Sequence, residues 1–439
     1  MADADTIFAL SSAAGFAGVA VVRISGPKAL DIAQKITRLK NPKPRYAHFV
    51  TLWDENKIID KAILIYFKGP SSFTGEDVIE IQCHGSRAVL KALFLILSNM
   101  DGCRMAEAGE FTRRAVYNNK MDLTAAEGLI DLIHAETEAQ RAAAVRQMDG
   151  NLQKIYDDWR KKLVKTMAYV EAFIDFPEEE IPPEQSEKIT AQINEIRTEM
   201  QNLLQADHGV GERLKSGFQI AIVGAPNVGK SSLLNAITRS DKAIVSDIAG
   251  TTRDVVEAYL DISGYPVVLA DTAGLRKTRG VIEGKGVEKA IDKARTSDLL
   301  LAVVSAENYP KMDEKTADLI KTHPCSMVVW NKSDKRAVPA KNLSVCAKTG
   351  QGIDTLMTHI RQIVEEKMSC SAPAVLTRLR YEKAMKECDE ALNRALSTDI
   401  LELKAEELRL AARALGKITG VVRTEELLDV IFSSFCIGK

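Results

Sequence analysis

Apolar residues recur every three or four positions over long parts of this 439-residue chain, and elsewhere they gather in short β-branched runs. The first pattern is typical of amphipathic helices and the second of strands. Helices are predicted over residues 88–97, 123–148, 152–174, 187–206, 375–396, 401–415 and 424–435. Strands are predicted over residues 18–24, 61–67, 77–83, 218–223, 267–270, 327–330 and 343–345.

The order of these elements divides the chain into four segments. Residues 1–118 mix strands with helices, which predicts an α+β domain. Residues 119–212 and 371–439 are helical, and strand–helix alternation fills residues 213–370 between them. We therefore expect a multidomain α/β and all-α fold, in which one helical domain is built from two segments and an α/β domain is inserted between them.

Composition and charge narrow the class of protein. A hydrophobic content of 46% with 27% charged residues indicates a folded chain, and a net charge of −1 gives no overall positive field toward nucleic acid. The seven cysteines lack paired spacing, which argues against a zinc site or a disulfide framework and favours reduced thiols in the cytoplasm. No apolar run approaches the roughly 20 residues of a membrane span, so no membrane contact is expected.

The inserted segment opens with a phosphate-binding pattern. The predicted strand at 218–223 is followed by Gly-Ala-Pro-Asn-Val-Gly-Lys-Ser at 224–231 and then by helical spacing. Glycines let backbone N–H groups approach phosphates, and a helix N-terminus favours their charge. Lys230 would then reach the β- and γ-phosphates, and Ser231 would bind Mg²⁺.

Three later motifs, each after a predicted strand, indicate a guanine nucleotide. Asp271 begins Asp-Thr-Ala-Gly and could bind Mg²⁺ through water. Asp334 closes Asn-Lys-Ser-Asp at 331–334 and can accept two guanine N–H groups that adenine does not present, with roughly 1.5–3 kcal/mol for each bond. Cys-Ala-Lys at 346–348 would complete the base pocket. This ordered set predicts a Ras-like P-loop G domain that hydrolyses GTP.

A switch loop is expected between the phosphate loop and Asp271. Thr252 is the candidate for a second Mg²⁺ ligand, although spacing alone does not separate it from Thr251. Leu275 stands where many small GTPases have a catalytic glutamine, so hydrolysis is either feeble or assisted by another group. The residues expected to contact GTP are Asn227, Val228, Gly229, Lys230, Ser231, Ser232, Ser246, Asp247, Ile248, Ala249, Gly250, Thr251, Thr252, Asp271, Thr272, Ala273, Gly274, Asn331, Lys332, Asp334, Cys346, Ala347 and Lys348.

The flanking segments carry motifs that GTPases in general do not share. They are Ser-Phe-Thr-Gly-Glu-Asp at 72–77, Glu-Ile-Gln-Cys-His-Gly at 80–85, Gly-Glu-Phe-Thr at 109–112, Lys-Met-Asp-Leu-Thr at 120–124 and Cys-Ile-Gly-Lys at 436–439. Together with the nucleotide motifs, they make essentially the whole chain resemble the MnmE (TrmE) family of tRNA modification GTPases. The resemblance implies that residues 1–118 form a tetrahydrofolate-binding and dimerisation domain.

The resemblance also implies a reaction and its partners. The family is a homodimer that works with the flavin- and NADH-using protein MnmG, as a heterotetramer with two MnmG chains. Together they add a carboxymethylaminomethyl or related aminomethyl-type group to C5 of the wobble uridine (position 34) of certain tRNAs. A one-carbon unit would come from 5-formyltetrahydrofolate or a related tetrahydrofolate.

Further site residues follow from the same resemblance. K⁺ would take the place of an arginine finger. Because the resemblance assigns Thr251 to K⁺, Thr252 would be the Mg²⁺ ligand. The K⁺ ligands would be Asn227, Ser246, Ile248 and Thr251. Glu283 would orient the hydrolytic water and act with Lys230 in catalysis, whereas without the resemblance it would be taken for a solvated switch residue.

A folate site is implied at Arg23, Glu80, Lys120 and Lys439. A carboxylate such as Glu80 can accept the paired N–H groups of a pterin ring, and cations suit the glutamate tail of folate. An ordinary surface charge is the alternative for each of these residues. Cys436 is either a reactive thiol near this site or a small buried hydrophobe.

Two other kinds of GTPase remain as alternatives. A ribosome-assembly GTPase, acting as an RNA-binding timer, would carry an appended basic domain, whereas the flanks of this chain are near neutral. A membrane-remodelling G protein would carry a lipid-facing segment, and the sequence shows none.

Overall fold

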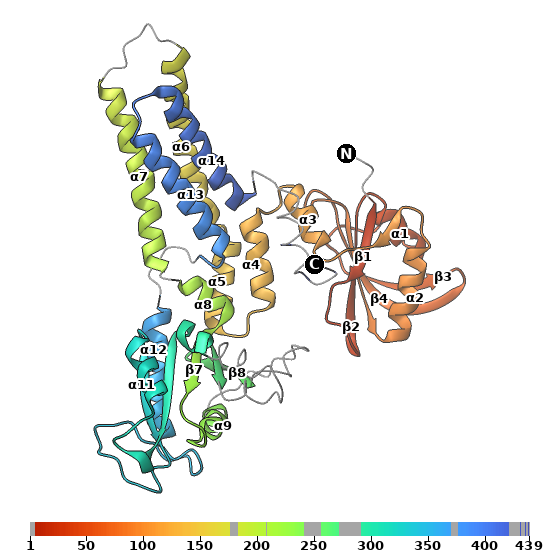
Figure 1. Cartoon of the computed structure of the whole chain (residues 1–439). Helices are drawn as coiled ribbons and strands as arrows, with labels where there is room; N and C mark the ends of the chain where they lie inside the picture. Colours follow the sequence, from red (N-terminus) through yellow and green to blue (C-terminus); the bar gives the residue numbers. More distant parts are fainter. Residues whose placement is uncertain are drawn as a thin grey trace, which may run out of the picture. The chain divides into compact units, whose positions relative to one another are not determined.

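The computed structural model describes residues 5–175, 183–207, 209–240, 256–271, 291–369, 376–420, 431, 435 and 438 (Figure 1). By their contacts these residues form two compact units, one of residues 1–130 with 415–439 and one of residues 131–414. Within the described ranges, no helix is both long enough and apolar enough to cross a membrane.

The first unit is built on a six-stranded sheet in the order β3-β4-β5-β2-β1-β6. Its strands are β1 (Thr6–Leu10), β2 (Ala17–Ser25), β3 (His48–Asp54), β4 (Lys57–Phe67), β5 (Val78–Gly85) and β6 (Cys103–Met105). Neighbouring strands are antiparallel except β1 and β6. The helices are α1 (Ala29–Thr37), α2 (Arg87–Ser98), α3 (Glu110–Tyr117) and most of α4 (Leu123–Ile133).

Helices α1 and α2 cover one face of this sheet. Ile79, Ile81 and Cys83 of β5 point into the core between the sheet and these helices, as the alternation in β5 predicted, and are at most 3% exposed. Leu93 and Leu97 of α2 pack against the same core and are fully buried. Because side chains alternate along a strand, the neighbours of these residues in β5 lie on the opposite face.

The opposite face of the sheet is open over β3 and β4. Phe49 is 75% exposed there, and its cross-strand partner Ile63 is 38% exposed. Over β1 this face is covered, because Ile7 packs with Phe111 of α3 and with Phe73. The sheet therefore presents two neighbouring apolar side chains to solvent on this face.

The second unit contains a bundle of long helices. Its members are α5 (Glu138–Met148), α6 (Asn151–Asp175), α7 (Pro183–Asp207), α13 (Leu379–Leu396) and α14 (Leu401–Thr419). Figure 1 shows α6, α7, α13 and α14 running side by side. Tyr156 and Trp159 of α6 are buried in the bundle, and the indole of Trp159 donates to Glu199 of α7 at 2.6 Å.

One predicted helix is two helices in the structure, and another falls mostly outside the described residues. The single helix expected over residues 123–148 is wrong, because α4 ends at Ile133 and α5 begins at Glu138. Thr137 and Gln140 form a capping box that starts the second helix, and a capped start competes with continuation of the first. The helix expected at 424–435 lies almost wholly outside the described residues.

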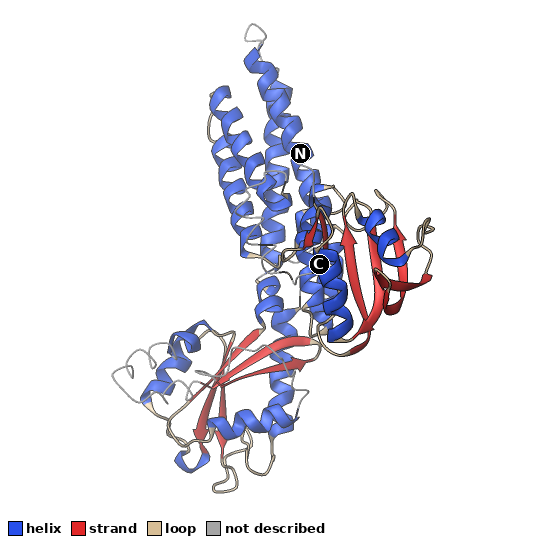
Figure 2. Ribbon diagram, turned by 90° about the vertical axis from the view of Figure 1, so that its right-hand side faces the viewer, coloured by secondary structure: helices blue, strands red, loops and turns tan. Residues whose placement is uncertain are grey.

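The remainder of the second unit is a five-stranded sheet in the order β11-β10-β7-β9-β8. Its elements are α8 (Val210–Ser216), β7 (Phe218–Val223), α9 (Lys230–Ser240), β8 (Val256–Ile262), β9 (Tyr265–Asp271), β10 (Leu299–Ser305), the 3₁₀ turn η2 (Ala306–Asn308), α11 (Glu314–Thr322), β11 (Ser326–Asn331) and α12 (Ile353–Met368). All pairs are parallel except β8 with β9. The strands of both sheets are red in Figure 2.

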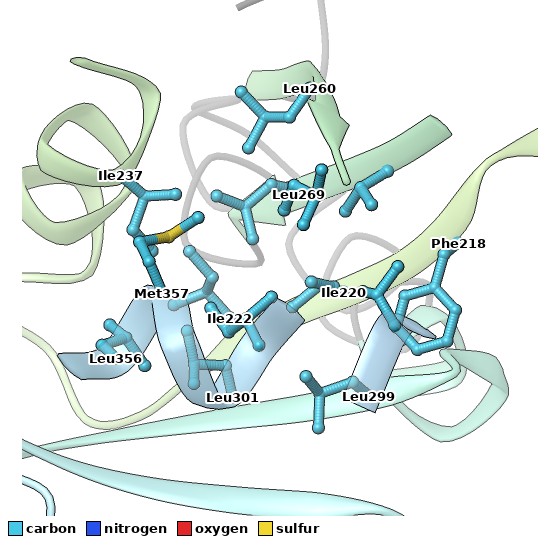
Figure 3. Packing of buried hydrophobic residues seen from close by; sticks show 14 of the residues in the cluster. Phe218, Ile220, Ile222, Ile237, Leu260, Leu269, Leu299, Leu301, Leu356 and Met357 are labelled. Atoms are coloured by element: carbon cyan, nitrogen blue, oxygen red, sulfur yellow. The ribbon is translucent and has the colours of Figure 1, made fainter. Parts of the chain in front are cut away.

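The core of this α/β domain lies between the sheet and α8, α9 and α12. Figure 3 shows Ile222 of β7 near Met357 of α12 and Ile237 of α9, with Ile220 further along β7, and all four are at most 1% exposed. The strand predicted at 343–345 is wrong, because Ser344 makes only an isolated bridge to β11. Since β7, β9, β10 and β11 are parallel, their carboxyl ends share one edge, where ligands bind in such sheets.

The chain crosses twice between the bundle and the α/β domain, and the two crossings are bonded together. Asp207 ends α7 with 1% exposure, and its Oδ1 accepts the backbone N–H of Leu376 at 3.0 Å. Gly211, just after the first crossing, lies so close that a Cβ there would collide with the carbonyl of Leu376. Burial raises the pKa of the Asp207 carboxyl, although the Leu376 amide acts against this.

Candidate nucleotide-binding site

The predicted phosphate loop joins β7 to α9. Gly224 and Gly229 have φ of +148° and +95°, values that side chains rarely adopt. A Cβ on Gly224 would collide with the carbonyl of Val303 in β10, and one on Gly229 with the amide of Asn331. The motif glycines are therefore required by the fold of the loop as well as by any phosphate.

Lys230 is the first residue of α9, and its side chain is held within the loop. The residue is 7% exposed, and its ammonium donates to the carbonyls of Gly224 at 2.9 Å and Ala225 at 2.8 Å. A buried ammonium at a helix N-terminus gives this loop a fixed positive charge. Such an arrangement suits polyphosphate.

Ser231 and Asp271 meet at the edge of the sheet where a magnesium ion would be needed. The Ser231 hydroxyl donates to Asp271 Oδ2 at 2.6 Å, and Asp271, at the end of β9, is 1% exposed. Hydroxyl and carboxylate oxygens are the ligands Mg²⁺ prefers, usually with phosphate and water completing its shell. The donor set fits such an ion. The described residues contain no cluster of three or more His, Cys, Asp or Glu that could hold a metal alone.

The loop after β11 is bonded to the phosphate loop through two of its side chains. The Asn331 amide donates to the carbonyl of Val228 at 2.9 Å, and its oxygen accepts the N–H of Ala347 at 3.1 Å. The Lys332 ammonium donates to the carbonyl of Asn227 at 2.7 Å. Three loops at the carboxyl edge of the sheet are thus joined at Asn331 and Lys332.

Asp334 lies at the exposed end of this assembly. Its Oδ1 accepts a hydrogen bond from the thiol of Cys346 at 3.2 Å, and Cys346 is 1% exposed. An exposed carboxylate held by a buried neighbour can receive two N–H groups from a planar base. This is the geometry expected for guanine recognition.

Part of the predicted site lies outside the described residues. These positions are Ser246, Asp247, Ile248, Ala249, Gly250, Thr251, Thr252, Thr272, Ala273, Gly274 and Glu283. Ser232 and Lys348, by contrast, are described and exposed beside the loops to which the motifs assign them.

The N-terminal unit holds the second predicted site. Arg23 of β2 and Glu80 of β5 are cross-strand partners, and Arg23 Nη2 donates to Glu80 Oε1 at 2.9 Å. The guanidinium carbon of Arg23 lies 5.1 Å from the ring centre of Phe73 and 5.7 Å from that of Phe111. Lys120 has a different partner, the carbonyl of Pro70 at 2.8 Å.

The structure thus joins two of the four residues expected at a folate site. Lys439 and Cys436 lie outside the described residues. Sequence reasoning missed the two phenylalanines, although both belong to the motifs at 72–77 and 109–112. Motif membership was the available signal, and only the fold shows that both rings lie near one arginine.

Two glutamates of the flanking motifs are bonded within the protein. Glu110 is 7% exposed and accepts from Arg104 at 2.7 Å and from Arg114 at 2.9 Å. Burial favours a higher pKa for Glu110, but hydrogen bonds from Arg104, the Glu107 amide and Arg114 together hold the pKa below its usual range. Arg114 also donates to Glu76 at 3.1 Å, and Ser25 donates to the same carboxylate at 2.6 Å. These acids connect α3 to the sheet.

The nucleotide edge defines the class of protein. A mainly parallel sheet with a phosphate loop after β7, an acidic residue at the end of β9 and a base loop after β11 is the Ras-like G domain of GTP-hydrolysing proteins. Here it accompanies an α+β unit and a helical bundle.

Comparison with known families identifies the particular GTPase. The family model described as the MnmE helical domain matches residues 123–436, and that described as the GTP-binding protein TrmE N-terminus matches residues 6–120. The chain therefore belongs to the MnmE family of tRNA modification GTPases.

Curated relatives agree over their full length. The tRNA modification GTPase MnmE of Parvibaculum lavamentivorans is 47% identical and that of Paramagnetospirillum magneticum 46%, each with 99% of this chain and 100% of the relative covered. The MnmE of Rickettsia typhi is 43% identical with the same coverage.

Solved structures show a weaker likeness. Era of Aquifex aeolicus bound to GDP·AlF4⁻ is 26% identical, with 42% of this chain and 68% of that chain covered, at a TM-score of 0.27. The G domain of the FeoB iron transporter of T. maritima is 22% identical, with 33% and 98% covered, at a TM-score of 0.26.

Proposed function

We propose that this chain is a K⁺-dependent GTP hydrolase that acts with MnmG on certain tRNAs. Together they would add a carboxymethylaminomethyl or related aminomethyl-type group to C5 of the wobble uridine, with a one-carbon unit from a tetrahydrofolate. One observation supports the GTP site most strongly. Asn331 and Lys332 bind the phosphate loop while Asp334, two residues on, stays exposed for a base.

The described residues divide the work of GTP binding. Lys230 would neutralise the β- and γ-phosphates, and Asp334 would accept the two N–H groups of guanine. Ser231 would bind Mg²⁺ directly and Asp271 would bind it through water, and the ion would neutralise charge on the phosphate oxygens. Thr252 would be its second protein ligand.

Hydrolysis would depend on residues beyond these. K⁺ would be held by Asn227 together with Ser246, Ile248 and Thr251, and Glu283 would orient the attacking water. Glu283→Ala is expected to abolish GTP turnover while GDP affinity stays near the wild-type value. Weakened GDP binding in a fluorescence titration would make Glu283 a structural residue instead.

The N-terminal sheet is proposed to bind folate and a second copy of the chain. Both hydrogen bonds that Arg23 donates to Glu80 go to Oε1. The other carboxylate oxygen, Oε2, would receive a pterin N–H group. The exposed Phe49 and Ile63 lie on the open face of the same sheet and supply the apolar surface that a homodimer would bury. Lys120 and Lys439 would reach the folate glutamate tail.

The domain plan follows the family. We infer an N-terminal domain at residues 1–118, a helical domain from residues 119–212 and 371–439, and an inserted G domain at 213–370. A cytoplasmic location suits a tRNA-modifying enzyme, and the described cysteines are free thiols.

Analysis of modified nucleosides tests the proposal directly. A strain lacking this chain is expected to lose the C5 modification of wobble uridine, and the wild-type chain should restore it. A Lys230→Ala chain, expressed at the same level, should fail to restore it. Unchanged wobble uridine in the deletion strain would refute the proposed reaction.

A further inference from the structure

Glu307 is an acidic residue outside the nucleotide motifs, in the turn η2 that follows β10. Its side chain faces cations of the base loop, with Oε1 at 3.3 Å from Lys335 Nζ and Oε2 at 3.8 Å from Lys332 Nζ. Its backbone carbonyl accepts from Arg336 at 2.9 Å. A hydrogen bond from Ser305 and the nearby Lys335 hold the pKa of Glu307 below its usual range, so the group stays ionised.

The Lys332 ammonium is shared between this carboxylate and the phosphate loop. It donates to the carbonyl of Asn227 at 2.7 Å and keeps an anion on its other side. A lysine side chain has four rotatable bonds, and fixing its end costs conformational entropy. The Glu307 carboxylate beside the ammonium restricts the conformations of the Lys332 side chain in the free protein, so less entropy is lost when its end is fixed.

Glu307 and Cys346 hold the base loop from two directions. Glu307 binds Lys332, Lys335 and Arg336, the residues on either side of Asp334. Cys346 donates to Asp334 itself at 3.2 Å. Because Asp334 is exposed, its place depends on these neighbours and not on burial in the core.

We propose that Glu307 is a positioning residue for guanine recognition, which acts by holding Lys332 and the backbone around Asp334 in the arrangement that receives the base. The inference rests on the proposed roles of Lys332 and Asp334 in GTP binding. In this role Glu307 acts through Lys332 and the base loop, and needs no contact of its own with phosphate or base.

The test compares Glu307→Gln with Glu307→Asp and with the control Asp318→Asn. Asp318 is an exposed carboxylate on α11, 4.0 Å from Lys321, so the control removes one negative charge from the next element along the chain. Affinities for GTP and ITP are measured in the full-length protein, together with KM, kcat and the melting temperature. ITP lacks the exocyclic 2-amino group, so the ratio of the two affinities reports the placement of Asp334.

Glu307→Gln is expected to lower the preference for GTP over ITP by about threefold to fivefold, the size of an exposed ion pair. KM for GTP should rise with kcat unchanged, and the effect should shrink in high salt. Glu307→Asp should recover part of the preference, and Asp318→Asn should match the wild type.

An unchanged GTP/ITP ratio in Glu307→Gln, or an equal loss of affinity for both nucleotides, would overturn the inference. Asp334→Asn separates this failure from failure of the proposed GTP site. If Asp334→Asn leaves the ratio unchanged, the base site itself is wrong. If Asp334→Asn abolishes the preference and Glu307→Gln does not change it, only the role of Glu307 is wrong.

Discussion

The ammonium of Lys332 donates a 2.7 Å hydrogen bond to the carbonyl of Asn227, and both residues have a φ of +63°. Residues other than glycine rarely adopt positive φ, and where they do the strain is held by surrounding bonds. Here the bond joins two strained positions, one in the phosphate loop and one in the base loop. The two halves of the nucleotide site therefore keep their shape together.

Asn227 provides a test of the potassium hypothesis. GTP turnover of the wild type should be faster in K⁺ than in Na⁺ at equal ionic strength. Asn227→Gly preserves the positive φ but removes the amide oxygen, so it should lose the difference between the two ions. Asn227→Ala also removes the amide oxygen and, unlike the glycine variant, places a β-carbon at a positive φ, which strains the backbone. If Asn227→Gly kept full stimulation by K⁺, the side chain would not be a ligand.

Cys346 tests how the base carboxylate is held. Cys346→Ala removes the hydrogen bond to Asp334 and should weaken GDP binding by about threefold to tenfold, the effect of about one lost hydrogen bond. Cys346→Ser keeps a donor at the same place and should bind GDP at least as tightly as the wild type, because a hydroxyl is the stronger donor. Fluorescence titration with labelled GDP measures both. Equal affinities of the Ala and Ser variants would show that the bond to Asp334 does not contribute.

Asp207 predicts a pH dependence of stability. Its folded-state pKa is raised by burial, so its contribution to stability is full below the unfolded pKa and is lost as the pH rises through the folded value. Asp207→Asn removes the charge but keeps an oxygen for the Leu376 amide. As the pH rises from 4 to 8, the melting temperature of the variant should therefore increase relative to that of the wild type by about 1–3 °C.

Thermal unfolding followed by circular dichroism measures this difference. Asp318→Asn, at an exposed carboxylate, serves as the control and should show no such trend. A melting temperature of Asp207→Asn that falls relative to the wild type as the pH rises would contradict the assigned shift.

Arg23 tests the folate site. Arg23→Ala should weaken binding of 5-formyltetrahydrofolate about tenfold or more in calorimetry, because a charged hydrogen-bonding group near two aromatic rings is removed. Lys91→Ala, at an exposed position on α2, should bind like the wild type. Unchanged affinity in Arg23→Ala would remove this residue from the site.

The sequence predicted where β7, β9 and β11 end because each of these strands is an apolar run followed directly by its motif. The glycines of the phosphate loop follow β7, and the acid Asp271 closes β9, where strand ends were expected. The break between α4 and α5 was missed, because alanine-rich helical spacing runs up to Thr137 and obscures its capping box with Gln140.

Other features depend on contacts distant in the chain, and no local pattern reveals them. Glu307 acts on a loop 25 residues and more further along, which only the pairing of β10 with β11 brings near. The cation–π contacts of Arg23 with Phe73 and Phe111 depend likewise on the packing of α3 over β1.

The hydrogen bond between Asp207 and Leu376 bears on deletion and circular permutation of the inserted α/β domain. It places the two ends of the inserted G domain next to each other, so a short linker from Asp207 to Leu376 could close the helical bundle after the insert is removed. The removed segment would have neighbouring termini and could be circularly permuted without spanning a long gap. An insert attached in this way can be gained, exchanged or lost as one unit while the host bundle keeps its connectivity.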